Sequence, residues 1–208
     1  VQAFKRHPRT GHLEYLNQQS SEGAGPCHLI VDHSGRWVLV ANYTGGSVCI
    51  LPIETDGQLG AATDVKQHTG SSVNPARQKE PHPHSVWLSP DNRFAFVPDL
   101  GIDKIIIYEL DVENGKLLPG EADFYETEPG AGPRHFAFHP SGDYAFVINE
   151  LNSTITSLKY HSQNGRLEKI QTISTLPDGY AESNTCADVH VSPNGRFVFG
   201  SNRGHDSI

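Results

Sequence analysis

The stretch RHFAFHPSGDYAFVINE, residues 134–150, contains two short apolar runs separated by a turn. The runs cover residues 135–139 and 144–148, and the Pro-Ser-Gly-Asp sequence between them has the residue types of a tight turn. This pattern predicts a β-hairpin. Arg134 precedes its first strand and Glu150 follows its second, so we expect both charges at the open end of the hairpin.

This hairpin has three gapless counterparts in the chain, and their turn residues recur every 50–57 residues. The counterparts are CHLIVDHSGRWVLVANY (27–43), HSVWLSPDNRFAFVPDL (84–100) and ADVHVSPNGRFVFGSNR (187–203). After each of the first three copies comes a second hairpin with Gly-x-Leu at its turn exit (47–62, 104–120 and 154–170). One unit is therefore four short antiparallel strands in about 50 residues, which is typical of a β-propeller blade.

The repeats predict an all-β protein, a partial β-propeller of four-stranded antiparallel blades with the innermost strand first in each unit. No segment has the periodicity of a long helix. We expect a single domain over residues 1–208. The expected division is the end of a blade at 1–24, full blades at 25–81, 82–131 and 132–185, and the start of a blade at 186–208.

The composition limits which kinds of partner the protein can bind and indicates its cellular compartment. The formal net charge is −8 and no Lys/Arg run is present, which argues against nucleic acid and anionic membranes as partners. No apolar run approaches the roughly 20 residues that span a bilayer, and no signal-like segment is visible at the start. The three cysteines, Cys27, Cys49 and Cys186, fit neither a disulfide framework nor a zinc motif. We expect a cytoplasmic protein, and the absence of Met predicts that the natural N-terminus lies upstream.

Comparison of the repeats separates scaffold positions from candidate site positions. The position at the end of each second strand is always Asn or Asp, and a side chain that caps the following turn accounts for it. Two positions instead hold a different residue in each unit, as a site assembled from several blades requires. They contain Cys27, His84, Arg134 and Ala187 at the entry to the first strand, and Tyr43, Leu100, Glu150 and Arg203 after the second.

Counting strand pairs outward from each turn predicts which residues face one another at the open ends. The expected partners are Asn149 for Arg134, Glu150 for Pro133, Asp99 for His84 and Cys186 for Arg203, with Asp188 two residues further inward. Because a propeller places all these ends on one face, we expect His84, Arg134, Glu150 and Arg203 to line one cationic funnel, with His82 beside them and Arg77 and Lys79 on the loop leading in. Such a funnel suits an anionic small molecule. The alternative is an exposed Arg134–Glu150 ion pair worth about 0–1 kcal/mol.

Several segments together resemble the lactonase family of seven-bladed β-propellers, which includes propeller-type 6-phosphogluconolactonase and carboxymuconate lactonizing enzyme. The segments are EPHPHS (80–85), GAGPRHFAFHPSGDYAFVINELNST (130–154), ADVHVSPNGRFVFGSNRGHDSI (187–208) and GPCHLIVDHSGRWVLVANYTGGSV (25–48). The resemblance implies an active site of one His, one Glu and two Arg, which fall by motif on His84, Glu150, Arg134 and Arg203. It also implies seven blades, of which about four are covered.

The resemblance implies a hydrolase of the pentose phosphate pathway that converts 6-phosphogluconolactone to 6-phosphogluconate without a metal or cofactor. We expect Glu150 to be the general base, Arg134 to stabilise the oxyanion and Arg203 to bind a phosphate or carboxylate. His84 would donate the proton to the leaving group, or act as base if Glu150 only orients other groups. His82 and Asp188 are further candidates for substrate contact.

Two other functions are compatible with the same residues. One is cyclisation of a carboxymuconate at the same four side chains. The other is a non-catalytic propeller that serves as a binding platform. Independently of function, open sheet edges in a four-blade chain would favour association into oligomers.

Overall fold

The computed structural model describes all of residues 1–208. Its secondary structure consists of β-strands, with no helix. Three sheets have four antiparallel strands each, and a two-stranded sheet lies at either end. The first complete sheet contains β3 (Pro26–Val31), β4 (Trp37–Asn42), β5 (Ser47–Pro52) and β6 (Asp64–Gln67). The second contains β7 (Trp87–Leu88), β8 (Phe94–Asp99), β9 (Lys104–Asp111) and β10 (Lys116–Glu126). The third contains β11 (Pro133–Phe138), β12 (Tyr144–Asn149), β13 (Thr154–His161) and β14 (Arg166–Ser174).

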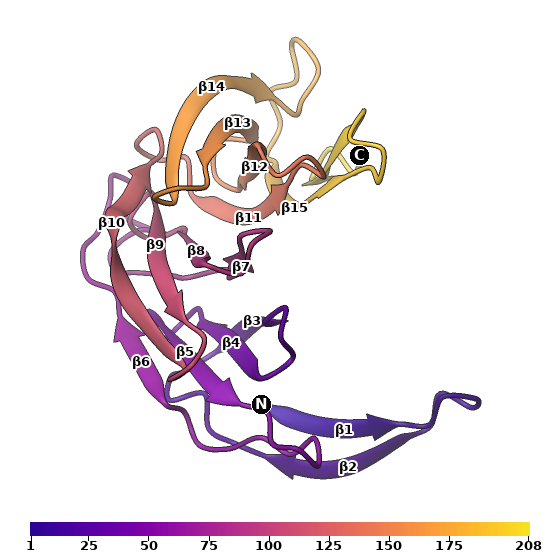
Figure 1. Cartoon of the computed structure of the whole chain (residues 1–208). Helices are drawn as coiled ribbons and strands as arrows, with labels where there is room; N and C mark the ends of the chain where they lie inside the picture. The colour runs from indigo at the N-terminus through magenta and orange to yellow at the C-terminus, as the bar shows by residue number, and fades with distance from the viewer.

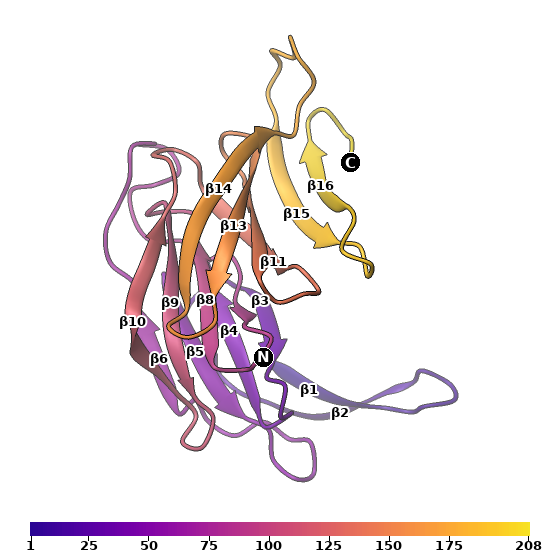
Figure 2. The same ribbon diagram turned by 45° about the horizontal axis from the view of Figure 1, so that its top comes forward.

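The end sheets are β1 (Gln2–Arg6) with β2 (Leu13–Gln18), and β15 (Thr185–Val191) with β16 (Val198–Arg203). The sheets follow one another around an arc, with β3, β7, β11 and β15 on its inner side and β6, β10 and β14 on its outer side (Figure 1). Figure 2 shows the hairpin β1–β2 projecting away from the stacked sheets. The predicted all-β fold of four-stranded antiparallel blades is confirmed.

The division of the chain into blades at residues 24, 81, 131 and 185 stays a proposal. β15 begins at Thr185, one residue before the expected start of the last partial blade. The structure contains no helix of the length and apolar character that a membrane crossing needs.

The apolar core lies between neighbouring sheets. One cluster joins Leu39 and Ile50 of the first complete sheet to Val97 of the second. The next cluster joins Phe96 of the second sheet to Phe136 of the third, with stacked rings whose centroids are 5.4 Å apart. Burial of one such side chain contributes about 1.5–3 kcal/mol to the free energy of unfolding. Because these side chains are buried between sheets, each sheet is stabilised largely by packing against its neighbours.

A β-bulge at the open end of the first hairpin changes the predicted register. The inner pairs of the third sheet follow the expected count, with His135 opposite Ile148, but Pro133 pairs with Asn149 and Arg134 is the extra residue. The other sheets share the shift, with the pairs Pro26–Asn42, Pro83–Asp99, Thr185–Arg203 and Cys186–Asn202.

The predicted pairs Arg134–Asn149, Pro133–Glu150, His84–Asp99 and Arg203–Cys186 are therefore wrong by one residue. The turn determines the register near the turn, whereas an extra residue further along one strand is absorbed locally by a bulge. A bulge bends the strand and re-aims its side chains. In the first and third complete sheets the extra residues are Cys27 and Arg134, which occupy one of the two variable positions of the repeat.

Candidate active site

Glu150 directly follows β12, and three arginines surround its buried carboxylate. Arg77 Nη2 lies 2.7 Å from Oε1, whereas Arg134 Nε lies 2.9 Å and Arg203 Nη2 3.0 Å from Oε2. The Glu150 side chain is only 5% exposed. Both carboxylate oxygens are therefore engaged by guanidinium groups.

Different parts of the fold supply these side chains. Arg134 lies in the bulge of β11, Arg203 ends β16, and Arg77 comes from the long loop between β6 and β7. Two of the arginines also donate to backbone carbonyls of β15: Arg134 Nη1 to Ala187 O at 2.5 Å and Arg203 Nη2 to Cys186 O at 2.9 Å. The cluster thus depends on the stacking of the third sheet against β15 and β16.

Three positive groups around one negative group leave an excess of positive charge at this point of an otherwise anionic chain. Burial acts to raise the pKa of Glu150, but the hydrogen bond and charge of Arg77 and the charges of Arg203 and Arg134 outweigh it. The pKa of Glu150 therefore lies below its ordinary value. At neutral pH the side chain is a carboxylate with little tendency to take up a proton.

His84 lies beside this cluster. Its Nε2 atom is 4.0 Å from Glu150 Oε2, which is beyond hydrogen-bond distance, and its Nδ1 atom is buried without a hydrogen-bond partner. Burial, and next the charge of Arg134, lower the pKa of His84 to about 4. His84 is therefore a neutral imidazole at pH 7 and a weaker base than an ordinary histidine.

His82 contacts the cluster through Tyr43. The two rings stack with centroids 4.4 Å apart, and His82 Nδ1 donates to the Tyr43 carbonyl oxygen at 3.0 Å. Tyr43 Oη in turn accepts from Arg77 Nη2 at 3.3 Å. Asp188 does not touch Glu150, and its carboxylate instead binds His135 Nδ1 at 2.7 Å.

The structure thus brings His84, Arg134, Glu150 and Arg203 together, and it places His82 and Asp188 one contact further away. Arg77, expected only on the loop leading to the funnel, contacts Glu150 directly, and Tyr43 was not among the expected site residues. Tyr43 occupies one of the two variable positions of the repeat, which is a signal that could have identified it. Arg77 lies in a loop with no counterpart in the other units, so repeat comparison could not rank it.

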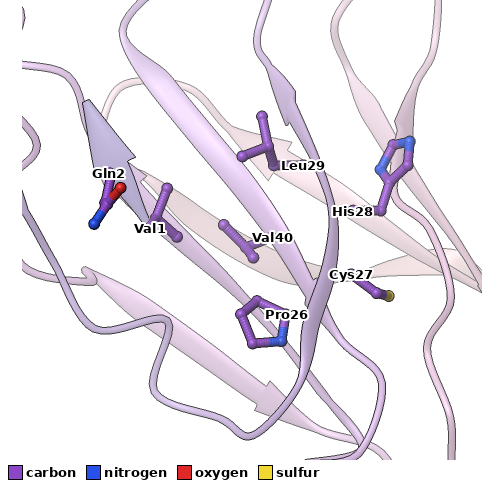
Figure 3. A pocket seen from close by; sticks show the side chains of 7 residues that line it. All are labelled: Val1, Gln2, Pro26, Cys27, His28, Leu29 and Val40. Atoms are coloured by element: carbon purple, nitrogen blue, oxygen red, sulfur yellow. The ribbon is translucent and has the colours of Figure 1, made fainter. Parts of the chain in front are cut away.

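A pocket of about 320 Å³ lies between the start of β1 and the β3–β4 pair, and none of the clustered residues lines it (Figure 3). Its lining residues are Val1, Gln2, Pro26, Cys27, His28, Leu29 and Val40. It contains no arginine and no carboxylate, so we base the site on the charged cluster. No group of three or more His, Cys, Asp and Glu side chains is arranged to hold a metal ion.

Four-stranded antiparallel sheets stacked around an arc, with a polar cluster built from several of them, define the chain as part of a β-propeller. The family described as "Lactonase, 7-bladed beta-propeller" matches residues 1–208. The chain belongs to this lactonase family, which confirms the resemblance seen in the sequence.

Individual relatives agree with this assignment. The chain is 39% identical over 208 residues to a protein of Bacillus subtilis named 6-phosphogluconolactonase, covering all of this chain and 58% of that protein. It is 34% identical to a protein of the same name from Formosa agariphila, covering 59% of it. The solved structure of the periplasmic gluconolactonase of Pseudomonas aeruginosa matches with a TM-score of 0.92 at 35% identity, over 98% of this chain and 57% of that one. The chain therefore spans less than three fifths of the relatives that it matches.

Proposed function

We propose that the protein hydrolyses the ring ester of a sugar lactone that carries an anionic group, with 6-phosphogluconolactone as the first candidate. The observation that carries the proposal is the buried Glu150 carboxylate held by Arg77, Arg134 and Arg203. The names of the relatives support lactone hydrolysis. The excess positive charge supports an anionic substrate.

The three arginines differ in exposure, and this difference indicates which part of the substrate each one binds. Arg203 and Arg77 keep 49% and 38% of their side chains exposed, so their remaining N–H groups can meet a phosphate from solvent. Arg134 is 14% exposed and lies between Glu150 and β15. We assign it to the carbonyl oxygen, where a positioned donor stabilises the negative charge of the tetrahedral intermediate.

In this proposal Glu150 holds the arginines in place and is not the general base expected from the sequence. Both of its oxygens are engaged, and its pKa is lowered, so it is a weak proton acceptor. Water attacks the lactone carbonyl carbon, the ring C–O bond then breaks, and the ring oxygen leaves as a hydroxyl group. The proton of this water passes to a neutral imidazole beside the cluster.

The test is a lactone panel assayed with the full-length protein that the gene encodes. We expect hydrolysis of 6-phosphogluconolactone above the spontaneous rate, with kcat/KM at least about tenfold higher than for uncharged gluconolactone, because one charge-assisted contact contributes about 1.5–3 kcal/mol. Cyclisation of a carboxymuconate, with no sugar-lactone hydrolysis, would favour the second enzyme hypothesis. Binding of these anions without turnover would favour a non-catalytic platform.

A further inference from the structure

A histidine–carboxylate pair lies next to the arginine cluster and takes no part in it. His135 follows Arg134 on β11, and its Nδ1 atom lies 2.7 Å from Asp188 Oδ1 on β15. The ring of His135 makes an edge-to-face contact with the ring of His84, with centroids 5.5 Å apart. His84 therefore lies between this pair and Glu150.

The hydrogen bond to Asp188 determines which nitrogen of His135 carries the proton. An ionised carboxylate can only accept hydrogen bonds, so Nδ1 must donate and the neutral ring has its lone pair on Nε2. Asp188 is itself held, since Oδ1 also accepts from the Val189 backbone N–H at 2.9 Å and Oδ2 lies 2.9 Å from His190 Nε2. The His135 side chain is 16% exposed, so Nε2 is not sealed from water.

Of Glu150, His84 and His135, only His135 is oriented by a neighbouring carboxylate and keeps one nitrogen free. Glu150 has both oxygens engaged by arginines. His84 has no carboxylate within hydrogen-bond distance, and its Nδ1 atom has no partner. A base that is oriented by a third group through its other nitrogen is the arrangement that general-base catalysis requires.

We propose that His135, oriented by Asp188, takes the proton of the hydrolytic water, with His84 shaping the space between His135 and the arginines. This inference rests on the proposed lactone hydrolysis. One water O–H bond breaks as its proton moves to His135 Nε2, and the water oxygen forms a bond to the carbonyl carbon. The π electron pair moves to the carbonyl oxygen. When it returns, the ring C–O bond breaks, and the proton on His135 passes to the leaving oxygen.

The groups that face His135 determine its titration. They are Asp188 and His190 on β15, Arg134 on β11, His84 before β7 and His28 on β3. Burial lowers the pKa of His135, the hydrogen bond and charge of Asp188 oppose this, and Arg134 and His190 lower it further. The pKa lies below its ordinary value, so the ring is neutral and able to accept a proton at pH 7. Without the Asp188 charge, the pKa must fall further.

The experiment compares His135→Gln, Asp188→Asn and the double variant in the full-length protein, assayed with 6-phosphogluconolactone and gluconolactone between pH 4 and 9. We expect each single variant to lower kcat about 100-fold, because positioned general bases contribute 10²–10⁴ in rate, with KM changed by less than about threefold. The double variant should lose no more than either single one, since the pair acts as a unit. In Asp188→Asn the acid limb of the kcat profile should also move to lower pH.

A second histidine–carboxylate pair supplies a matched control. His161 Nε2 lies 3.1 Å from Glu168 Oε2 on the outer strands β13 and β14, and we expect His161→Gln and Glu168→Gln to leave kcat and the pH profile unchanged. Nuclear magnetic resonance titration of the histidine ring protons reports the pKa of His135 directly and shows whether each variant is folded.

The outcomes separate this inference from the proposed function. If the parent protein hydrolyses lactones while folded His135→Gln keeps kcat within about threefold, the inference is wrong and the proposed function stands. An unmoved acid limb in Asp188→Asn would also overturn it, since a structural role would not shift the limb. If the parent hydrolyses no lactone, the proposed function fails first and the inference fails with it.

Discussion

Arg203 Nη2 lies 3.0 Å from Glu150 Oε2, although Arg203 ends β16 and Glu150 follows β12 of a different sheet. Each sheet supplies one partner of this ion pair, so the pair forms only when the two sheets are packed together. Arg203 also donates to the Cys186 carbonyl oxygen, so its guanidinium bridges the two sheets. The charged cluster is therefore a product of sheet stacking, and mutations in it can be used to test both binding and catalysis.

Glu150→Gln should disturb substrate binding as well as the rate. The substitution removes the negative charge that holds three guanidinium groups in place, so we expect kcat/KM for 6-phosphogluconolactone to fall about 100-fold or more. Competitive inhibition by inorganic phosphate should weaken in parallel. A fall in kcat with unchanged phosphate inhibition would instead indicate that Glu150 is the general base.

His139→Ser is the control for that experiment. His139 Nδ1 binds Ser141 Oγ at 2.9 Å and Nε2 binds the Gly195 carbonyl oxygen at 3.0 Å, so its polar contacts lie within turns. Ser occupies the equivalent turn position in other units. We expect steady-state kinetics of this variant to match those of the parent.

Arg203→Lys should separate anionic from uncharged substrates. Lysine keeps the positive charge but loses the planar fork that binds a phosphate through two parallel hydrogen bonds. We expect KM for 6-phosphogluconolactone to rise about tenfold, while kcat/KM for gluconolactone stays within about twofold. An equal loss for both lactones would place Arg203 at the carbonyl and not at the phosphate.

Asp32→Asn should change the acid stability of the protein. The Asp32 carboxylate accepts from the backbone N–H groups of Arg36 and Trp37, from Ser34 and from Asn92 of the neighbouring sheet. Burial acts to raise the pKa of Asp32, but hydrogen bonds from Ser34, Asn92 and Trp37 outweigh it and hold the pKa below its ordinary value.

Because the folded-state pKa of Asp32 is depressed, its contribution to stability is present above the unfolded value near 4 and is lost as pH falls through the folded value. At pH 7 we expect Asp32→Asn to lower the free energy of unfolding by about 1–3 kcal/mol. The difference from the parent should shrink below about pH 4. Urea titrations at pH 7 and at successive acid pH values measure it, and a difference that is constant with pH would contradict the assignment.

Gly115→Ala should destabilise the contact between the first two complete sheets. Gly115 has φ of +61°, and an added Cβ would lie 2.2 Å from the Trp37 ring. Gly35 has a similar φ of +72° but open space around it, so Gly35→Ala measures the backbone cost alone. We expect about 1 kcal/mol for Gly35→Ala and about 1–3 kcal/mol more for Gly115→Ala by chemical denaturation. Equal losses would mean that Trp37 can move aside.

Much of the fold could be predicted from the sequence because the decisive signals are local. A strand–turn–strand pattern such as 134–150 depends on alternating apolar residues and on turn chemistry within a few positions. Its recurrence along the chain shows that the same unit is used repeatedly, which is enough to identify propeller blades. His84, Arg134, Glu150 and Arg203 could be chosen for the same reason, since each differs from the residues at the equivalent position of the other units.

Tertiary structure alone decided the register at the open ends and the roles of the charged groups. The bulge that re-aims Arg134 arises where strand pairing gives way to contacts between sheets, which no turn sequence encodes. Arg77 reaches Glu150 from a loop outside the repeat. The lowered pKa of Glu150 and the His135–Asp188 pair depend on burial and on charges from other sheets. The sequence therefore determined the kind of repeating unit and the candidate residues. Packing between units determined which atoms meet and how their pKa values shift, because Coulombic and desolvation effects act through space and not along the chain.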